Sequence, residues 1–88
     1  MPNLTIRDGG REFVFQIQED RISVGRAGAN AVEVHDGLAS KEHCLLERVG
    51  NRWKLVDLES KNGTKVNGQY RNKAWLRHDD TIAIGAAE

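Results

Sequence analysis

The sequence predicts an all-β fold, a sandwich of two sheets built from short, mostly antiparallel strands. Three observations predict it. Apolar and polar residues alternate in short runs, helical periodicity is hard to find, and turn residues separate the runs at close intervals. Many short strands with frequent turns are typical of a sandwich or a barrel. At 88 residues the chain has room for one domain with one modest core.

The strands are expected where the alternation is clearest. In chain order these runs are residues 4–6, 12–17, 21–25, 32–34, 43–49, 53–58, 64–67 and 81–85. Phe13, Phe15 and Ile17 fall on one face of their run, and Ile22 and Val24 fall on one face of the next. Because charged neighbours take the other face, each sheet is expected to be buried on one side.

Turn residues lie between these runs, and two of the connections are longer than a turn requires. The turns are expected at Asp8-Gly9-Gly10, residues 25–30, Asp36-Gly37, Gly50-Asn51, Asn62-Gly63 and Asn67-Gly68. The two long loops cover residues 25–31 and 35–43. Binding residues tend to lie on long loops of a small rigid scaffold. With no repeat, low-complexity tract or linker, residues 1–88 are expected to form one domain.

Composition excludes several classes of function. Lysine and arginine number 13 and acidic residues number 13, so no global field attracts DNA, RNA or an anionic membrane. Any anion must therefore be bound by a local cluster. Aromatic residues are few and no basic patch is interleaved with them along the sequence, so nucleic acid is not an expected partner.

The cysteine and histidine content bears on compartment and on metal binding. Cys44 is the only cysteine, so an internal disulfide is impossible, and a reducing, cytoplasmic setting is expected. The N-terminus lacks a signal-peptide pattern and no apolar stretch is long enough to span a bilayer, which predicts a soluble chain. His35, His43 and His78 are scattered, so no metal site and no cofactor are predicted.

Candidate anion-binding residues lie in the loops. Arg26 follows Gly25 at the end of a predicted strand, and a guanidinium binds phosphate or carboxylate through two parallel hydrogen bonds. Ser40 and Lys41 place a hydroxyl donor beside an ammonium group, and Lys61 lies in another loop. Together these residues could surround a phosphate, although each one alone is weak evidence and is more typical of an ordinary solvated surface.

His43, three residues after Ser40, suggests a serine esterase as an alternative. That chemistry needs an orienting acid, such as Asp36 or Asp57, and an oxyanion site. No nucleophile-elbow motif surrounds Ser40. We therefore favour a structural role for His43, as a hydrogen-bonding residue that ties a loop to the sheet.

Two Asn-Gly steps lie only a few residues apart, and a hairpin needs only one. Asn67-Gly68 lies between two short runs and predicts a tight hairpin in which both residues have positive φ. Asn62-Gly63 instead follows residues 57–61 and is expected at a loop tip. An asparagine there can offer its carbonyl and its amide together to an extended peptide backbone.

Taken together, these segments resemble the forkhead-associated (FHA) domain, a phosphothreonine-binding β-sandwich. The resemblance rests on "ISVGR" from Ile22, "SKEH" from Ser40 and "DLESKNGTKVNG" from Asp57, in the family's order, and it extends through "LRHDDTIAIG". It implies two sheets with the binding loops at one end. The residues that match the family's site are Arg26, Ser40 and Lys41 for the phosphate, Asn62 for the peptide backbone, and Gly25, His43 and Gly63 for the shape of the loops.

Three departures from the family pattern leave alternatives open. Lys61 stands where many members carry a small hydroxyl residue, so it either reaches the phosphate or faces solvent. Trp75, in the bulky and charged segment 69–77, belongs either to the core or to an exposed contact surface. The family usually continues beyond residues 81–85 into one more strand. An unpaired sheet edge is therefore expected, in a chain that is part of a longer protein or that receives this strand from another chain.

The function implied by the resemblance is recognition rather than catalysis. We expect a non-catalytic module that binds a phosphothreonine-containing protein in a serine/threonine kinase pathway. The main alternative keeps the fold but not the phosphate, with a sheet face or the Trp75 region acting as an assembly surface. The slot that would select threonine through its methyl group is not evident in the sequence.

Overall fold

The computed structural model describes residues 3–84, in which ten strands and no helix are present. No helix in this part of the chain is therefore available to cross a membrane. The strands are β1 (Asn3–Asp8), β2 (Arg11–Gln16), β3 (Arg21–Gly25), β4 (Val32–Glu33), β5 (Cys44–Val49), β6 (Arg52–Asp57), β7 (Thr64–Val66), β8 (Gln69–Tyr70), β9 (Lys73–Leu76) and β10 (Thr81–Ile84).

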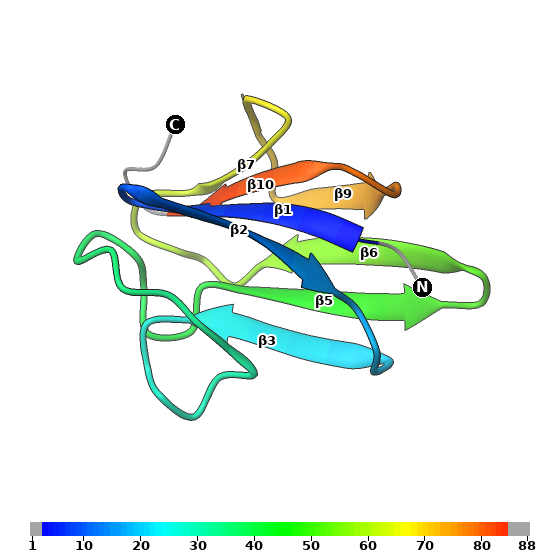
Figure 1. Cartoon of the computed structure of the whole chain (residues 1–88), viewed down its shortest axis with the longest axis horizontal. Helices are drawn as coiled ribbons and strands as arrows, with labels where there is room; N and C mark the ends of the chain where they lie inside the picture. Colours follow the sequence, from blue (N-terminus) through cyan, green and yellow to red (C-terminus); the bar gives the residue numbers. More distant parts are fainter. Residues whose placement is uncertain (1–2, 85–88) are drawn as a thin grey trace.

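The strands form two five-stranded sheets that pack face to face (Figure 1). One sheet has the order β2-β1-β10-β7-β8 and the other has the order β4-β3-β5-β6-β9. Most neighbouring strands are antiparallel, whereas β1 with β10 and β3 with β4 are parallel. The predicted two-sheet, mostly antiparallel sandwich is confirmed.

The core lies between the sheets and follows from the alternation of each strand. Leu4 and Ile6 of β1, Leu46 of β5 and Leu55 of β6 are fully buried, and Ile17 just after β2 joins them. Burying such a side chain contributes about 1.5–3 kcal/mol to the free energy of folding. Phe13 and Phe15 pack against this cluster from β2, while Val14 between them faces solvent, as the predicted one-sided burial requires.

The N-terminal strand β1 has a neighbour on each side, β2 and β10, so the unpaired edge expected from a missing last strand does not lie at β1 in the described residues. The outer strands of this sheet are β2 and β8. β10 pairs directly with β1 in parallel, in a register that runs from Thr5 opposite Thr81 to Asp8 opposite Ile84. The pairing is favourable because Ile6 and Ile82 stand side by side and are both buried in the core. Whether the chain belongs to a longer protein stays a prediction.

Two strands, β8 and β9, are missing from the runs expected in the sequence; β8 was implied only as the second arm of the Asn67-Gly68 hairpin, and β9 was not predicted. Ala74 and Leu76 point into the core, whereas Lys73 and Trp75 are exposed, so the segment alternates as a strand should. Segment 69–77 was interpreted as a connection because its largest apolar side chain, Trp75, lies on the polar face. Trp75 is not part of the core, and 45% of its surface is exposed.

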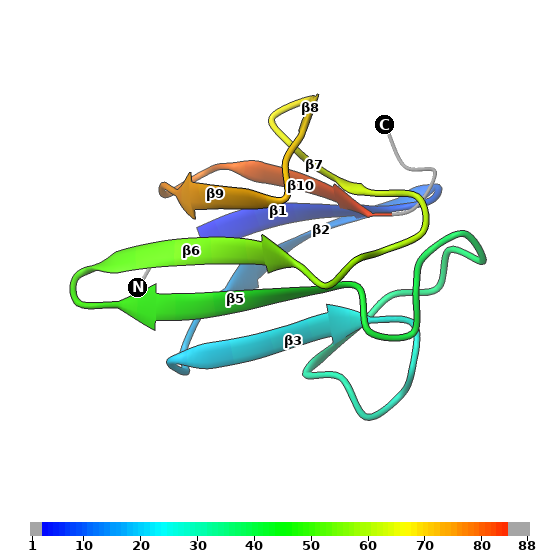
Figure 2. The ribbon, with the colours of Figure 1, turned by 180° about the vertical axis from the view of Figure 1, so that it is seen from behind.

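The connections that were predicted to bind gather at one end of the sandwich. Residues 26–31, 34–43 and 58–63 all emerge there, together with the turn between β1 and β2 (Figures 1 and 2). The Asn67-Gly68 hairpin between β7 and β8 has the predicted positive φ at both residues, 51° and 84°. The longer connections therefore share one end of a rigid scaffold.

Candidate functional site

The first loop leaves β3 at Gly25, where only a glycine fits. A Cβ atom at this position would lie 2.1 Å from the Lys41 carbonyl oxygen and 2.8 Å from the Asn30 side-chain nitrogen. The loop that contains Lys41 therefore lies directly against β3. Two backbone hydrogen bonds hold the loops together, from Arg26 N–H to the Ser40 carbonyl (3.0 Å) and from Ala27 N–H to the Lys41 carbonyl (3.2 Å).

Arg26 is fixed at its base and exposed at its tip. Its side-chain Nε donates a hydrogen bond to the Ala39 carbonyl at 3.1 Å. Among residues 3–84 no acceptor engages its two terminal nitrogens, and no carboxylate forms an ion pair with it. The guanidinium is thus oriented by the neighbouring loop while its fork of N–H donors is available to an anion.

Ser40 connects this loop to the loop after β6. Its Oγ accepts a hydrogen bond from the Lys61 backbone N–H at 3.0 Å. Because the oxygen accepts this bond, the hydroxyl hydrogen stays free to donate to another group. The same contact holds Lys61 close to Arg26 and Lys41, at the border of one pocket.

His43 is buried and holds two loops through its ring. Nδ1 accepts a hydrogen bond from the Ser40 N–H at 3.0 Å, so the proton of the neutral ring is on Nε2, which donates to the Gly63 carbonyl at 2.8 Å. Both ring nitrogens are therefore used by the backbone. This geometry fits the bracing role and leaves His43 no nitrogen with which to deprotonate the Ser40 hydroxyl.

Asp57 organises the loop that follows β6. It accepts hydrogen bonds from the Ser60 hydroxyl (2.6 Å), the Ser60 N–H (2.9 Å) and the buried Thr64 hydroxyl (2.7 Å). Burial opposes ionisation of this carboxyl, but the hydrogen bonds outweigh it, so the pKa of Asp57 lies below its usual value. Asp57 therefore shapes the loop and does not orient His43.

Asn62 and Gly63 form the tip of that loop. The Asn62 side-chain nitrogen donates to the Leu38 carbonyl at 2.7 Å, which leaves its carbonyl oxygen and one N–H for a ligand. Gly63 has a φ of +83°, and a Cβ there would lie 2.8 Å from the Tyr70 ring. The positive φ favours glycine at the first Asn-Gly step, and the exposed Tyr70 ring would have to move to admit a Cβ there.

The five residues predicted to contact a ligand line one open pocket of about 480 Å³, whereas the loop-shaping residues Gly25, His43 and Gly63 do not line it. It is lined by Arg26, Gly37, Leu38, Ala39, Ser40, Lys41, Lys61 and Asn62. Its three cationic side chains are exposed, and within the described residues none of them forms an ion pair. No carboxylate lines the pocket, so its chemistry is that of a small anion site.

Comparison with known proteins identifies the family. A family model described as the FHA domain matches residues 22–85, which is most of the chain. The chain belongs to the FHA domain family. Its solved FHA neighbours include a domain from a study of phosphothreonine-dependent FHA interactions, with 28% identity and a TM-score of 0.79 over 94% of this chain and 86% of that one.

Two more FHA structures are similar in fold and sequence. The FhaA FHA domain, solved in complex with the intracellular domain of Rv3910, has 28% identity and a TM-score of 0.78 over 92% of this chain and 89% of that one. The FHA-2 domain of the Mycobacterium tuberculosis ABC transporter Rv1747 has 32% identity and a TM-score of 0.70 over 86% and 69%.

The curated relatives are longer proteins. An oxoglutarate dehydrogenase inhibitor of Corynebacterium jeikeium is 31% identical over 81% of this chain and 49% of its own length. The Mycobacterium tuberculosis transporter Rv1747 is 34% identical over 73% of this chain and 7% of its own length. The FHA chain described here thus spans about half of one relative and a small part of the other.

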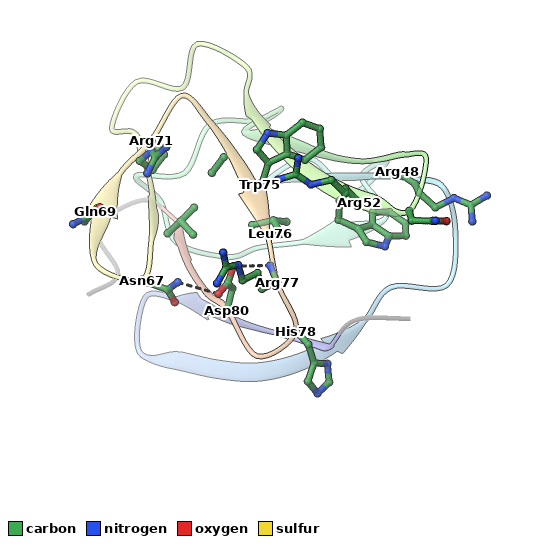
Figure 3. A pocket seen from close by; sticks show the side chains of 14 residues that line it. Arg48, Arg52, Asn67, Gln69, Arg71, Trp75, Leu76, Arg77, His78 and Asp80 are labelled. Atoms are coloured by element: carbon green, nitrogen blue, oxygen red, sulfur yellow. Dashed lines mark hydrogen bonds between the residues drawn. The ribbon is translucent and has the colours of Figure 1, made fainter.

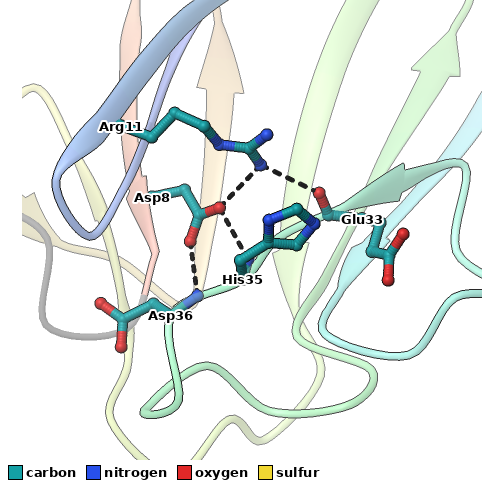
Figure 4. Close-up of polar contacts among 5 residues, drawn as sticks. All are labelled: Asp8, Arg11, Glu33, His35 and Asp36. Carbon is teal, nitrogen blue, oxygen red and sulfur yellow. Dashed lines mark hydrogen bonds and ion pairs between the residues drawn. The ribbon is translucent and has the colours of Figure 1, made fainter.

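One tie between the FHA loops and the sheet was missed in the sequence. Asp8, at the end of β1, is buried and accepts hydrogen bonds from the backbone N–H groups of His35 (2.7 Å) and Asp36 (2.8 Å) and from the Arg11 side chain (2.8 Å), as Figure 4 shows. Burial raises the pKa of Asp8, but these hydrogen bonds lower it by more, and the net shift is downward. Arg11 also donates to the Glu33 carbonyl at 3.2 Å.

A second missed residue, Asn30, bridges the two long loops. Its side-chain nitrogen donates to the Ala27 carbonyl (2.8 Å) and to the Lys41 carbonyl (2.7 Å). Neither Asp8 nor Asn30 stands in a recognisable motif, since an aspartate or asparagine beside a glycine or alanine reads as an ordinary turn residue. Only the folded arrangement shows what their side chains contact.

Proposed function

We propose that this FHA domain is a non-catalytic module that binds phosphothreonine peptides in the loop-end pocket. The observation that carries the proposal is the convergence of Arg26, Ser40, Lys41 and Lys61 on one pocket that no carboxylate lines. Phosphothreonine brings about −1.5 to −2 charges and three acceptor oxygens at neutral pH. The pocket offers a guanidinium fork, a hydroxyl donor and two ammonium groups, which match that ligand.

The arrangement of the donors supports tight binding of a dianion. Each charge-assisted hydrogen bond contributes about 1.5–3 kcal/mol. Arg26 is already oriented by its bond to the Ala39 carbonyl, so less side-chain freedom is lost when the phosphate binds. We assign Lys61 to the phosphate as well, because the bond from its backbone to Ser40 keeps it at the pocket.

Asn62 is proposed to hold the peptide backbone next to the phosphothreonine. Its side chain is fixed by the bond to the Leu38 carbonyl, and its remaining carbonyl oxygen and N–H can pair with a peptide N–H and C=O. The threonine methyl group is then placed between the loop of residues 34–43 and the loop of residues 58–63. Leu38 and Ala39, which line the pocket there, supply the apolar contact that distinguishes threonine from serine.

The comparisons support a recognition role. One structural neighbour was studied for phosphothreonine-dependent interactions, and EmbR of Mycobacterium tuberculosis was solved with a low-affinity phosphopeptide, at 25% identity and a TM-score of 0.75. Two of the curated relatives, an inhibitor and a transporter, differ in their names yet both match this chain. A shared binding module accounts for that better than a shared reaction.

The same proposal extends to the cellular setting. A phosphothreonine ligand places the domain downstream of a serine/threonine kinase, and the buried reduced thiol of Cys44 suits the cytoplasm. An esterase built on Ser40 is disfavoured, because both ring nitrogens of His43 are hydrogen-bonded to backbone groups. No cofactor is needed for binding of this kind.

A phosphate-independent assembly role is the alternative, and the exposed Trp75 is the observation that favours it. The triple substitution of Arg26, Ser40 and Lys41 by alanine separates the two roles. We expect it to abolish binding of the natural partner. Retained partner binding by the folded triple variant would instead support assembly through the Trp75 region.

The direct test is titration of the whole chain with degenerate phosphothreonine peptides, alongside phosphoserine and unphosphorylated sets. Only the phosphothreonine set is expected to bind. Affinity should fall as pH is lowered through the second phosphate pKa of about 6, because the dianion is the better acceptor. Equal binding of all three sets, or a pH-independent affinity, would contradict the proposal.

A further inference from the structure

A second depression lies along the side of the sandwich, away from the loop end. It is a groove of about 1200 Å³ between β9 of one sheet and the β7–β8 hairpin of the other (Figure 3). It shares no lining residue with the loop-end pocket. A ligand bound in this groove would therefore be distinct from the phosphothreonine.

The groove is positively charged although the whole chain is neutral. Its lining includes Arg48, Arg52, Arg71 and Arg77 but only one carboxylate, Asp80. That carboxylate accepts hydrogen bonds from the Asn67 side chain (3.0 Å) and from the backbone N–H of Arg77 (2.8 Å), rather than from a guanidinium. Sequence spacing hides this cluster because its arginines come from different strands and turns.

Three of the four guanidinium groups lack an acidic partner. Arg48 pairs with Asp20 at 3.0 Å, outside the groove. Within residues 3–84 no ion pair involves Arg52, Arg71 or Arg77. Uncompensated cations on the walls of a groove focus the field and attract an anionic ligand.

Trp75 holds one of these cations in place. The Arg52 guanidinium carbon lies 3.9 Å from the centre of a Trp75 ring, and the indole is 45% exposed (Figure 3). Such cation–π stacking orients the guanidinium in advance, which lowers the entropic cost of binding. The stacked arginine also covers one face of the indole, so that face cannot stack on a nucleic-acid base.

The groove runs along an open sheet edge. Among the described residues β9 pairs only with β6. The Asp57 N–H donates to the Asn72 carbonyl at 2.7 Å, so the backbone of residue 72 faces β6. In an antiparallel pair the backbone groups of successive residues face alternately toward and away from the partner strand, so the N–H and C=O of Lys73 and Trp75 face away from β6. These groups are placed to pair with an added strand. A second copy of this edge would be repelled by its own positive charge.

We propose that this groove binds an extended acidic segment of a partner protein as a strand added to β9. Arg71 and Arg77 stand just beyond the two ends of β9. Five residues lie between them, and this spacing of six positions spans about 20 Å in an extended strand, so the bound segment carries acidic residues about that far apart. A flat anionic membrane would leave the backbone of this edge unpaired, whereas a peptide pairs with it.

The probe is the capped peptide EEVTVTVEE, titrated into the full chain and followed by NMR of the backbone amides. We expect it to bind, and the amides of Lys73 and Trp75 to exchange more slowly with solvent in the complex. The peptide KKVTVTVKK, which has the same strand propensity and the opposite charge, should not bind. A central proline in the acidic peptide should weaken binding, because it blocks strand pairing.

Matched variants assign the binding to this groove. Arg71→Glu with Arg77→Glu should weaken binding of the acidic probe at least tenfold. Arg7→Glu with Arg21→Glu, the same change of net charge on β1 and β3, should change it less than twofold in a sample shown to be folded, since Arg7→Glu also removes the ion pair with Glu12. Binding that survives in Arg26→Ala separates the groove from the loop-end pocket. No binding, equal binding of the lysine peptide, or preferential binding of oligothymidine or of phosphatidylserine vesicles overturns the proposal.

Discussion

The loop-end pocket and the β9 groove are both cationic, but they are built in opposite ways. The pocket takes its donors from irregular loops that hydrogen bonds of Asp8, Asn30, His43 and Asp57 hold in place. The groove takes Arg48 and Arg52 from strands β5 and β6, and Arg71 and Arg77 from positions directly after β8 and β9. The loops of the pocket depend on residues that do not line it, whereas the arginines of the groove lie on a strand or directly beside one. The two sites should therefore respond differently to substitution.

The largest effect is expected at Gly25, where the two loops can approach each other only because glycine has no side chain. Gly25→Ala places a Cβ 2.1 Å from the Lys41 carbonyl oxygen, so the loops must separate. We expect a loss of about 3 kcal/mol in the free energy of unfolding, by analogy with overpacking. Urea denaturation measures it, with Gly28→Ala in the same loop as the control, since a Cβ there makes only an ordinary contact. Equal stability of the two variants would contradict this packing.

Next in size is the loss of the phosphate fork. Arg26→Ala should weaken phosphothreonine peptide binding at least tenfold, because at least one charge-assisted bond of about 1.5–3 kcal/mol disappears. The free energy of unfolding should fall by no more than about 1 kcal/mol, because the exposed side chain loses only its one hydrogen bond to the Ala39 carbonyl. Calorimetric titration measures the affinity, and Arg21→Ala, at the other end of β3, is the control. An unchanged affinity in Arg26→Ala would remove this residue from the site.

A smaller effect is expected from the loop-organising carboxylate. Asp57→Asn replaces one acceptor oxygen by an NH2 group and leaves a partner donor unsatisfied, which costs about 1–3 kcal/mol. Because the folded pKa of Asp57 is lowered, its contribution is complete above the unfolded pKa of about 3.9 and is lost as pH falls through the folded value. The free energy of unfolding of the variant should therefore decline less than that of the unmodified protein between about pH 5 and pH 2, the range in which Asp57 takes up its proton. An identical decline in both proteins would show that Asp57 makes no such contribution.

The smallest effect is expected across the two sites. Arg71→Glu with Arg77→Glu should change phosphothreonine affinity less than twofold, because the groove and the pocket share no lining residue and salt screens exposed charges over about 8 Å at physiological ionic strength. The same titration used for Arg26 measures it. A tenfold loss would show that one ligand spans both sites.

The two sites also differ in how far the sequence predicts them. Arg26, Ser40 and Asn62 lie in short ordered motifs, so their pocket was predictable before the fold was known. Tertiary contacts such as Asp8 to the backbone of residues 35 and 36 leave no local signal, because the partners are 27 and 28 residues apart. The groove was hidden for a related reason, since its cations are dispersed along the chain and Trp75 masked the alternation of β9.

The pairing of β1 with β10 illustrates a limit of arguing from a family pattern. The family pattern implied that β1 would be left with an open edge. Instead β10 pairs with that edge, and the apolar faces of the two strands match, with Ile6 beside Ile82. Side-chain burial, rather than strand count, decided the pairing. A sequence predicts which face of a strand is buried more reliably than which strand lies beside it.

The most direct test of the account is an NMR titration of the whole chain with a phosphothreonine peptide, following every backbone amide. The account predicts that the shifts concentrate on Arg26, Ser40, Lys41, Lys61 and Asn62, while the amides of Lys73 and Trp75 stay unchanged. Shifts that concentrate on β9, or a folded chain that shows none, would contradict the assignment of phosphothreonine recognition to the loop end.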